Sequence, residues 1–185
     1  MENITALLLM DMQIAVLRGV DDAKEILQNA SAAAQKARHL GIPVIFVKIE
    51  FRLGGPEISL NNKIFGRTKA HTSNPDMTQM MDFSPVLIPQ PNDIIVVKKR
   101  LSAFAGSDLE IVLRSQKIQH LVLAGVSSSG VVLSTLREAA DKDYSITVLS
   151  DCCGDSDLSL KQVLEEKVFP MQATVCKLSD WNGQL

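Results

Sequence analysis

Residues 120–130 read His-Leu-Val-Leu-Ala-Gly-Val-Ser-Ser-Ser-Gly, and this stretch decides the fold of the chain. Its first half is a short apolar run without alternation, which is typical of a parallel strand covered by helices on both faces. After the glycine-serine turn, apolar residues recur at helical spacing at Val132, Leu136 and Ala139. A strand, a tight turn and a helix place backbone N–H groups at the carboxyl edge of a sheet, where open α/β sheets bind ligands.

Further apolar runs of strand length lie on both sides of this stretch. They occupy residues 5–10, 43–48, 93–97, 145–149 and 173–177. Helical periodicity appears between most of them, at residues 22–40, 107–113, 131–140 and 158–169. Strands that alternate with helices form parallel βαβ units. We therefore predict an α/β fold with three layers, in which a doubly wound, Rossmann-like sheet has six parallel strands.

Length, charge and cysteine content limit the class of protein. The chain has 185 residues, 46% of them apolar, so we expect a single domain over residues 1–185. A formal net charge of −2 leaves no basic excess to neutralise phosphates, which predicts no nucleic-acid partner. No apolar run reaches the ~20 residues of a membrane span, which predicts no membrane partner. The three cysteines have no metal-binding spacing, so we expect a reduced, cytoplasmic protein.

Residues 52–90 form the least regular part of the sequence. Glycine and proline punctuate this segment at Gly54, Gly55, Pro75 and Pro85, and only residues 60–69 are expected to form a helix. Such a long loop in a compact domain usually serves as a lid or as a subunit contact. We expect a homo-oligomer, a dimer or higher.

Polar residues follow the strands at the ends that meet in space. Asp11 follows the first strand, Lys98 follows a later one, and the turn at 125–131 follows the central one. Because the carboxyl ends of parallel strands share one edge of the sheet, we expect these segments to converge. An Asp beside a Lys in a partly dry cleft can pass a proton or stabilise a developing anion. The N–H groups of the turn can serve as an oxyanion hole.

Three motifs together resemble the isochorismatase-like hydrolases. They are Asp11-Met-Gln13, Lys98-x-Arg100-x-Ser102-Ala-Phe104 and Gly125-Val-Ser-Ser-Ser-Gly-Val-Val-Leu-Ser-Thr-Leu-Arg137-Glu-Ala. The resemblance covers nearly the whole chain. It implies a six-stranded parallel sheet and a catalytic set of Asp, Lys and Cys, which correspond here to Asp11, Lys98 and the position of Val131. It also implies a non-proline cis peptide between Val126 and Ser127.

Val131 stands where the family has its nucleophilic cysteine. A valine cannot attack a carbonyl, so the thioester route of the family's amidases lacks its nucleophile. Members that resemble isochorismatase itself also lack the cysteine and hydrolyse a vinyl ether by acid–base chemistry. The resemblance therefore implies a small-molecule hydrolase of the acid–base type. The alternative is a degenerate member that binds a metabolite or serves as an assembly scaffold.

The ligand contacts are predicted from the same edge of the sheet. Aromatic residues near strand ends, Phe51, Phe65, Phe83 and Phe104, can form an apolar wall for a small, partly hydrophobic substrate. The nicotinamidase metal site needs Asp-x-His and a further His, but Ile49-Glu-Phe-Arg52 follows the second strand, so we predict no catalytic metal and no cofactor. The expected substrate-binding residues are Gln13, Phe51, Ser102, Phe104, Val126, Ser127 and Ser128.

The two charged residues have simpler structural alternatives. Asp11 can cap the turn that follows its strand, which is a common use of Asp. Lys98 has Lys99 beside it, and the downstream Ser-Ala-Phe favours Lys98 as the motif residue.

Serine, cysteine and histidine also have structural alternatives to a catalytic role. One of the three serines at 127–129 is expected to be a helix N-cap rather than a nucleophile. Cys152 and Cys153 are expected to be small buried hydrophobes rather than a thiolate in the cleft. The three histidines, His39, His71 and His120, are expected to be structural or solvated.

Overall fold

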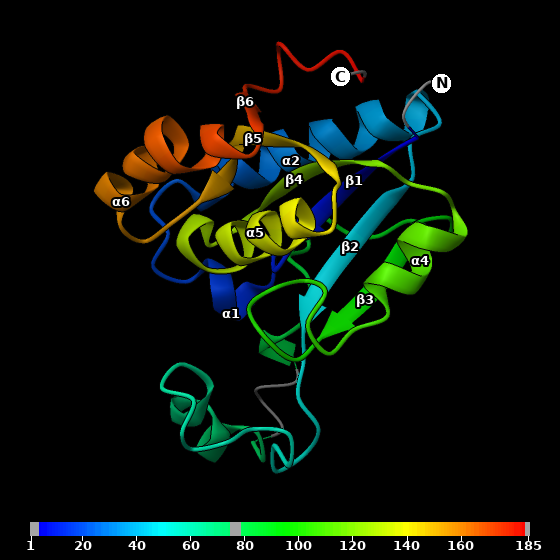
Figure 1. Cartoon of the computed structure of the whole chain (residues 1–185). Helices are drawn as coiled ribbons and strands as arrows, with labels where there is room; N and C mark the ends of the chain where they lie inside the picture. The colour runs from blue at the N-terminus through cyan, green and yellow to red at the C-terminus, as the bar shows by residue number, and fades with distance from the viewer. Residues whose placement is uncertain (1–3, 75–78, 184–185) are drawn as a thin grey trace.

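The strands form one parallel sheet in the computed structural model, which describes residues 4–74 and 79–183. The sheet has six strands in the order β3-β2-β1-β4-β5-β6, so the chain winds outward in both directions from the central pair β1 and β4 (Figure 1). The predicted α/β fold with a doubly wound parallel sheet is confirmed. The strands are β1 (Thr5–Met10), β2 (Val44–Ile49), β3 (Ile94–Lys98), β4 (His120–Val126), β5 (Ser145–Gly154) and β6 (Thr174–Cys176).

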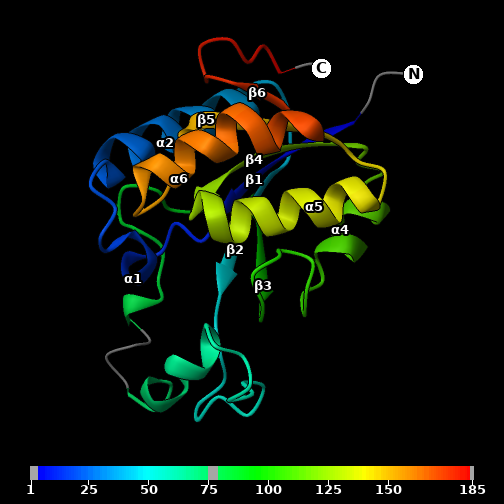
Figure 2. The same cartoon turned by 60° about the vertical axis from the view of Figure 1, so that its left-hand side comes forward.

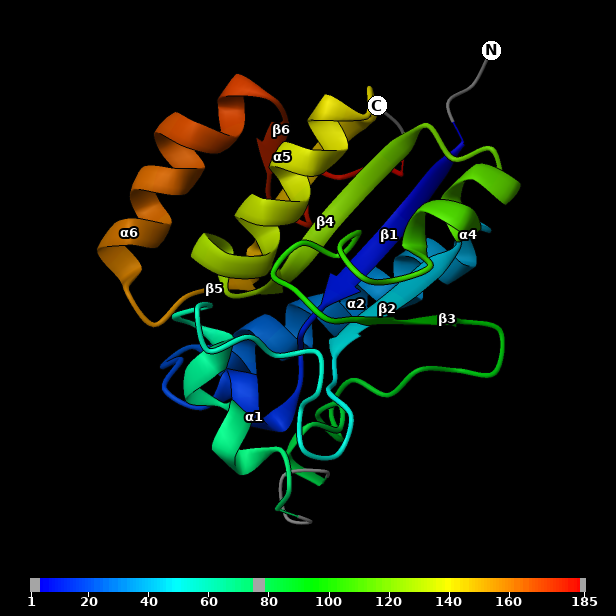
Figure 3. The ribbon, with the colours of Figure 1, turned by 60° about the horizontal axis from the view of Figure 1, so that its bottom comes forward.

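Helices cover both faces of the sheet. In Figure 3, α4, α5 and α6 lie in front of the sheet and α2 lies behind it. Neither these helices nor any other in the described part of the chain could span a membrane, since none is both long and apolar enough. The α-helices are α1 (Ile14–Leu17), α2 (Ala23–His39), α4 (Leu109–Ser115), α5 (Leu133–Asp141) and α6 (Leu158–Val163).

Two hydrophobic cores lie on the two faces of the sheet. Alternate residues of β1 point into different cores: Leu8 joins the cluster that includes α4 and α5, and Leu9 joins the cluster that includes α2. All six residues of β1 are buried. Since both faces of β1 are covered, its continuous apolar run is explained by burial on both sides.

The last part of β5 was not predicted as a strand. The expected strand ended at residue 149, but β5 continues to Gly154, and its register with β4 shifts near Gly125. Beyond this shift, Gly125 pairs with Cys153 and Val126 pairs with Gly154. The sequence does not predict this continuation, because the polar residues Ser150 and Asp151 interrupt the apolar run of the strand.

The segment after β2 projects from the carboxyl edge of the sheet as an arm, defined here as residues 50–74 (Figures 1 and 2). The predicted helix at 60–69 is wrong: only 3₁₀ turns form, at Phe65–Arg67 and Lys69–His71. The side chain of Asn62 accepts the N–H groups of Ile64 and Phe65, and this local bond competes with an α-helix. Pro75, which was expected to punctuate this segment, lies outside the described residues.

His120 joins three strands at the amino end of the sheet. Its Nδ1 lies 3.0 Å from Thr5 Oγ1 and its Nε2 lies 2.9 Å from Thr147 Oγ1, so β1, β4 and β5 are linked through one buried ring. The expected structural role of this histidine is confirmed. Burial lowers its pKa from the ordinary 6.5 to about 4.

We predict that acid weakens the fold through His120. The unfolded chain binds a proton to this residue at a higher pH than the folded chain, so its contribution is fully present above pH ~6.5 and is lost as the pH falls towards ~4. The measurement is the free energy of urea unfolding across this range. The His120→Gln variant, which keeps polar atoms and does not titrate, should show a smaller pH dependence, and an equal dependence in both proteins would contradict the prediction.

Candidate active site

The two charged residues predicted from strand ends meet as a buried ion pair. Asp11 directly follows β1, and Lys98 is the last residue of β3. Lys98 Nζ lies 2.7 Å from Asp11 Oδ2, and the two residues are 0% and 6% exposed. Because β2 lies between β1 and β3, the lysine side chain reaches across the end of one strand to make this contact.

The contacts of Asp11 do not show the turn cap that was the simpler alternative. Its backbone has φ of +55°, in the left-handed region that Asp tolerates better than most residues. Its N–H continues the sheet by donating to Val47 O at 2.8 Å. The carboxylate bonds to Lys98 through Oδ2, and Oδ1 is buried without a hydrogen-bond partner among the described residues. An orphaned acceptor of this kind is costly in a fold and is often found at functional sites.

Burial and mutual attraction act in opposite directions on the pair. Burial raises the pKa of Asp11 from 3.8 to about 6, although the nearby Lys98 ammonium opposes the rise. Burial also lowers the pKa of Lys98, and Asp11 opposes that fall. The carboxyl group therefore exchanges its proton close to neutral pH, which is where a general acid or base works best.

The ammonium of Lys98 has a second acceptor in the loop that follows β3. Its Nζ donates to Arg100 O at 2.9 Å. An ammonium carries three N–H groups, and the contacts of the described residues occupy two of them. The third N–H has no acceptor among these contacts.

The neighbouring Lys99 has different contacts. Its Nζ donates to Glu50 O at 2.5 Å and lies 3.9 Å from the Glu57 carboxylate. The ammonium that meets Asp11 thus belongs to Lys98, while Lys99 holds the arm.

The turn after β4 has the cis peptide that the resemblance implied, between Val126 and Ser127. A π-helical turn, Ser128–Val132, then leads into α5. Ser127 is the N-cap residue of this turn, as predicted for one of the three serines, but its side chain makes no capping hydrogen bond. The N–H of Ser129 donates instead to the Asp155 carboxylate at 2.8 Å. Asp155 was not among the predicted site residues, because the predicted strand ended at residue 149 and β5 continues to Gly154.

The proposed oxyanion hole is smaller than the sequence predicted. The N–H of Ser129 is bound by Asp155, and the N–H groups of Gly130 and Val132 both donate to Ser127 O at 3.2 Å. These amides are not available to a substrate unless the turn opens.

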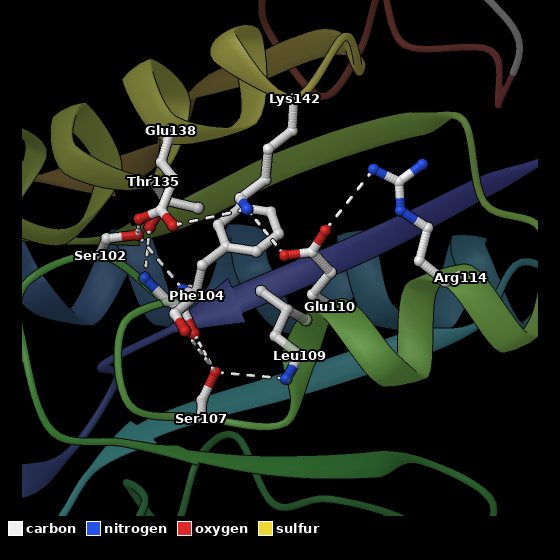
Figure 4. Close-up of polar contacts among 10 residues, drawn as sticks. Ser102, Phe104, Ser107, Leu109, Glu110, Arg114, Thr135, Glu138 and Lys142 are labelled. Carbon is white, nitrogen blue, oxygen red and sulfur yellow. Dashed lines mark hydrogen bonds and ion pairs between the residues drawn. The ribbon is translucent and has the colours of Figure 1, made fainter.

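The geometry does not support three of the expected substrate contacts. Gln13 is fully buried: its Oε1 accepts from Ile49 N, and its Nε2 donates to Ile49 O and Met81 O. Ser102 Oγ donates to the Glu138 carboxylate at 2.5 Å (Figure 4). Phe104 lies in the core, with its ring 6.1 Å from that of Tyr144. The polar atoms of Gln13 and Ser102 and the ring of Phe104 already contact other parts of the protein. We therefore assign these residues a supporting role in the site.

The positions expected in the turn are also mostly buried. Val126 and Val131 are each 1% exposed, and Ser128 is fully buried with its hydroxyl donating to Gly154 O. Ser127 is partly exposed. Val131 lies in the same core cluster as Met10, the residue before Asp11, so an apolar side chain fills the position at which the resemblance implied a cysteine.

A cavity of about 340 Å³ lies between α1, the end of β2 and the arm. The side chains of Phe51 and Phe65 line it and make an edge-to-face contact, with ring centroids 5.4 Å apart. The other aromatic candidates lie elsewhere, since Phe83 packs on Phe46 and Phe104 packs on Tyr144.

The cavity adjoins the ion pair without including it. Neither Asp11 nor Lys98 lines the cavity, but Ile49 and Met81 do, and both are held by the amide of Gln13. Ile49 is also the sheet partner of Lys98. One buried glutamine therefore fixes the wall that separates the cavity from the charged pair.

Cys152 and Cys153 are buried hydrophobes, as predicted. Cys152 and Cys153 lie inside β5 and are fully buried. Burial raises the pKa of the Cys153 thiol to about 12 and also raises the pKa of the Cys152 thiol, so neither forms a thiolate at neutral pH. Across residues 4–74 and 79–183, no group of three His, Cys, Asp or Glu residues is placed to hold a metal ion.

Comparison with known proteins identifies a family. A model of the isochorismatase domain matches residues 5–180. The ureidoacrylate amidohydrolase RutB of Pseudomonas syringae pv. syringae is 34% identical over 170 residues, which cover 80% of this chain and 69% of the relative. The uncharacterized isochorismatase family protein YecD of Escherichia coli O157:H7 is 28% identical over 92% of this chain and 90% of its own.

Solved structures give the same result. N-carbamoylsarcosine amidase from Thermoplasma acidophilum superposes with a TM-score of 0.78 and 26% identity, over 97% of this chain and 99% of that one. An isochorismatase family protein from Burkholderia thailandensis superposes with a TM-score of 0.82 and 25% identity, over 96% of this chain and 93% of that one.

We predict that Lys98→Met destabilises the fold, and more so at high pH. The substitution leaves the Asp11 carboxylate buried without its cation, which costs about 3–5 kcal/mol when it is ionised. Below the raised pKa of Asp11 the carboxyl group is protonated, so the loss is smaller in acid. Urea unfolding at about pH 5 and about pH 8 measures the difference.

The matched control is Lys99→Met, which removes an ammonium one residue away. Its partners are in the arm, so its effect should be smaller and should not grow with pH in the same way. An equal loss in the two variants would contradict the prediction.

Proposed function

The chain belongs to the isochorismatase family, and on that premise we propose that it is a small-molecule hydrolase in which Asp11 and Lys98 carry out acid–base chemistry. The observation that carries this proposal is the buried ion pair between them, at 2.7 Å. Such a pair is expensive to bury and is weak as a source of stability. A catalytic use explains why the fold contains it.

Each member of the pair has a defined part in the proposed reaction. Asp11, with a pKa of about 6, is partly protonated near neutral pH and can give its proton to the substrate. In a vinyl ether, protonation of the carbon–carbon double bond makes the ether carbon electrophilic, and water then adds there. The adduct breaks its carbon–oxygen bond to give a ketone and an alcohol, and Asp11 regains a proton. Lys98, 2.7 Å from Asp11 Oδ2, can stabilise the negative charge that develops on the Asp11 carboxyl group as it gives up its proton.

The cavity beside the pair supports a small substrate with an apolar body. Phe51, Ile64, Phe65 and Met81 supply most of an apolar wall, which is typical of small-molecule sites. The partial separation of the cavity from Asp11 means that the reacting end of the substrate must reach past Ile49. The arm provides much of this wall, so its residues should set specificity.

A thiol amidase is not proposed for this chain. Two relatives, by their names, hydrolyse ureidoacrylate and N-carbamoylsarcosine. Here Val131 stands at the position of the family nucleophile, and a valine has no group that can attack a carbonyl. Cys152 and Cys153 do not replace it, since both are buried within β5.

A second candidate function is a degenerate scaffold that binds a metabolite or serves only assembly. The observation that favours it is the enclosure of the pair, because Asp11 is 6% exposed, Lys98 is fully buried and neither borders the cavity. A protein of this kind would bind a small molecule without converting it.

The setting of the protein completes the proposal. We propose that it acts in the cytoplasm, as a single domain in a homo-oligomer, on a small-molecule substrate and without a nucleic-acid or membrane partner. Three free cysteines fit a reduced compartment. The projecting arm is a candidate subunit contact.

We predict that Asp11→Asn abolishes turnover, which a panel of vinyl ethers, esters and amides tests by product formation. Removal of a general acid lowers the rate by about 10²–10⁴-fold. The wild-type rate should fall as the pH rises through about 6, because the protonated carboxyl group is then lost. Asp21→Asn, which alters an exposed carboxylate that does not line the cavity, is the matched control. Full activity of Asp11→Asn, with its fold intact, would refute the mechanism and favour the scaffold.

We also predict that Val131→Cys gains amidase activity, measured as ammonia release from the amides of the same panel. Cysteine is smaller than valine, so the packed position accepts it without crowding. Val132→Cys, at the next buried position, is the control and should gain nothing. If Val131→Cys is inert to substrate and its thiol resists alkylation as strongly as that of Val132→Cys, position 131 does not face the reaction site.

A further inference from the structure

The loop after β3 supplies one of the two acceptors of the Lys98 ammonium. This loop, residues 99–106, closes on itself: Lys99 N–H donates to Ala105 O at 3.4 Å, and Ala105 N–H donates to Ser102 O at 3.2 Å. Within it, the carbonyl of Arg100 accepts from Lys98 Nζ. Because that acceptor is a backbone atom, its position depends on what holds the loop.

Helix α5 holds the loop from one side through two polar contacts (Figure 4). Thr135 Oγ1 accepts from Ala103 N–H at 2.9 Å, and both residues are fully buried. Glu138 Oε2 accepts from Ser102 Oγ at 2.5 Å. Residues 135 and 138 are one helical turn apart, so they lie on the same face of α5.

The arm holds the loop from the other side. Arg100 Nη2 donates to Glu57 O at 3.0 Å, and Lys99 Nζ donates to Glu50 O at 2.5 Å. These contacts place the loop between α5 and the arm. Of these contacts, the one between Ala103 and Thr135 is fully buried, and an N–H left without an acceptor there would have no water to replace it.

We propose that Thr135 and Glu138 are positioning residues for Lys98: they fix the loop so that the Arg100 carbonyl holds the ammonium against Asp11. A lysine side chain has four flexible methylene groups, so a single acceptor fixes its distance and leaves its direction free. The second acceptor sets the direction in which the remaining N–H points. The effect of this role on catalysis rests on the proposed hydrolase function. The contacts that position Lys98 do not depend on that function.

The test uses the titration of the Asp11 carboxyl group, followed by carbon NMR, because loss of alignment weakens its contact with Lys98. Thr135→Val removes the acceptor at constant shape, and we expect the titration midpoint to rise by about half a pH unit or more. Thr135→Ser keeps the hydroxyl and should restore the wild-type midpoint. A role limited to packing would lower the melting temperature without moving the titration.

Glu138→Ala is the second variant and has a matched control. Lys142 lies 3.9 Å from Glu138 and 2.7 Å from Glu110, so both acids pair with the same lysine, but the described contacts of Glu110 do not include the loop (Figure 4). We expect Glu138→Ala to raise the Asp11 midpoint and Glu110→Ala to leave it unchanged. This variant decides the question if Thr135→Val does not fold.

Two results would overturn the proposal. One is an unchanged Asp11 midpoint in folded Thr135→Val or, if that variant does not fold, in Glu138→Ala; the other is an equal shift in Glu110→Ala. Absence of turnover by the wild type on the substrate panel is a separate result, since it would refute the hydrolase function and leave the titration shifts as they are. The two failures are therefore distinguishable.

Discussion

The burial of two opposite charges at one edge of the sheet is the constraint on which the rest of the site depends. An ammonium and a carboxylate leave water only if each finds a partner and further hydrogen bonds. Within residues 4–74 and 79–183, Lys98 has two acceptors, Asp11 Oδ2 and Arg100 O, whereas Oδ1 of Asp11 has no hydrogen-bond partner. Burial raises the pKa of the acid, and the second carboxylate oxygen is left as an acceptor for a ligand proton.

The elements around the pair form a set of supports for it. Gln13 joins the end of β1 to the end of β2 and to Met81, and so separates the pair from the cavity. The loop after β3 is held by Thr135 on one side and by the arm on the other. Some residues that the sequence suggested as ligand contacts thus have a structural role. They support the ion pair, because buried charges need surroundings that hold them in place.

Much of the site was predictable for a physical reason. Parallel strands bring their carboxyl ends to one edge, so Asp11 and Lys98 could be placed together from two distant segments of sequence. Their contact, the cis peptide at Val126-Ser127 and the inert cysteines all agree with those predictions. Gln13, Ser102 and Phe104 could not be assigned in the same way, because a motif gives the residue type and not the direction of its side chain.

The sequence by itself determined the layers, the parallel sheet and the edge at which the candidate site lies, since apolar runs of strand length between amphipathic helices have few ways to be buried. Only the tertiary structure decided the extension of β5 to Gly154 and the irregular form of the arm, because register shifts and loop geometry depend on contacts with distant residues. It also decided the partners of each polar side chain. The Asp155 carboxylate accepts from the N–H of Ser129, 26 residues away in the chain. The Glu138 carboxylate accepts from the hydroxyl of Ser102, 36 residues away.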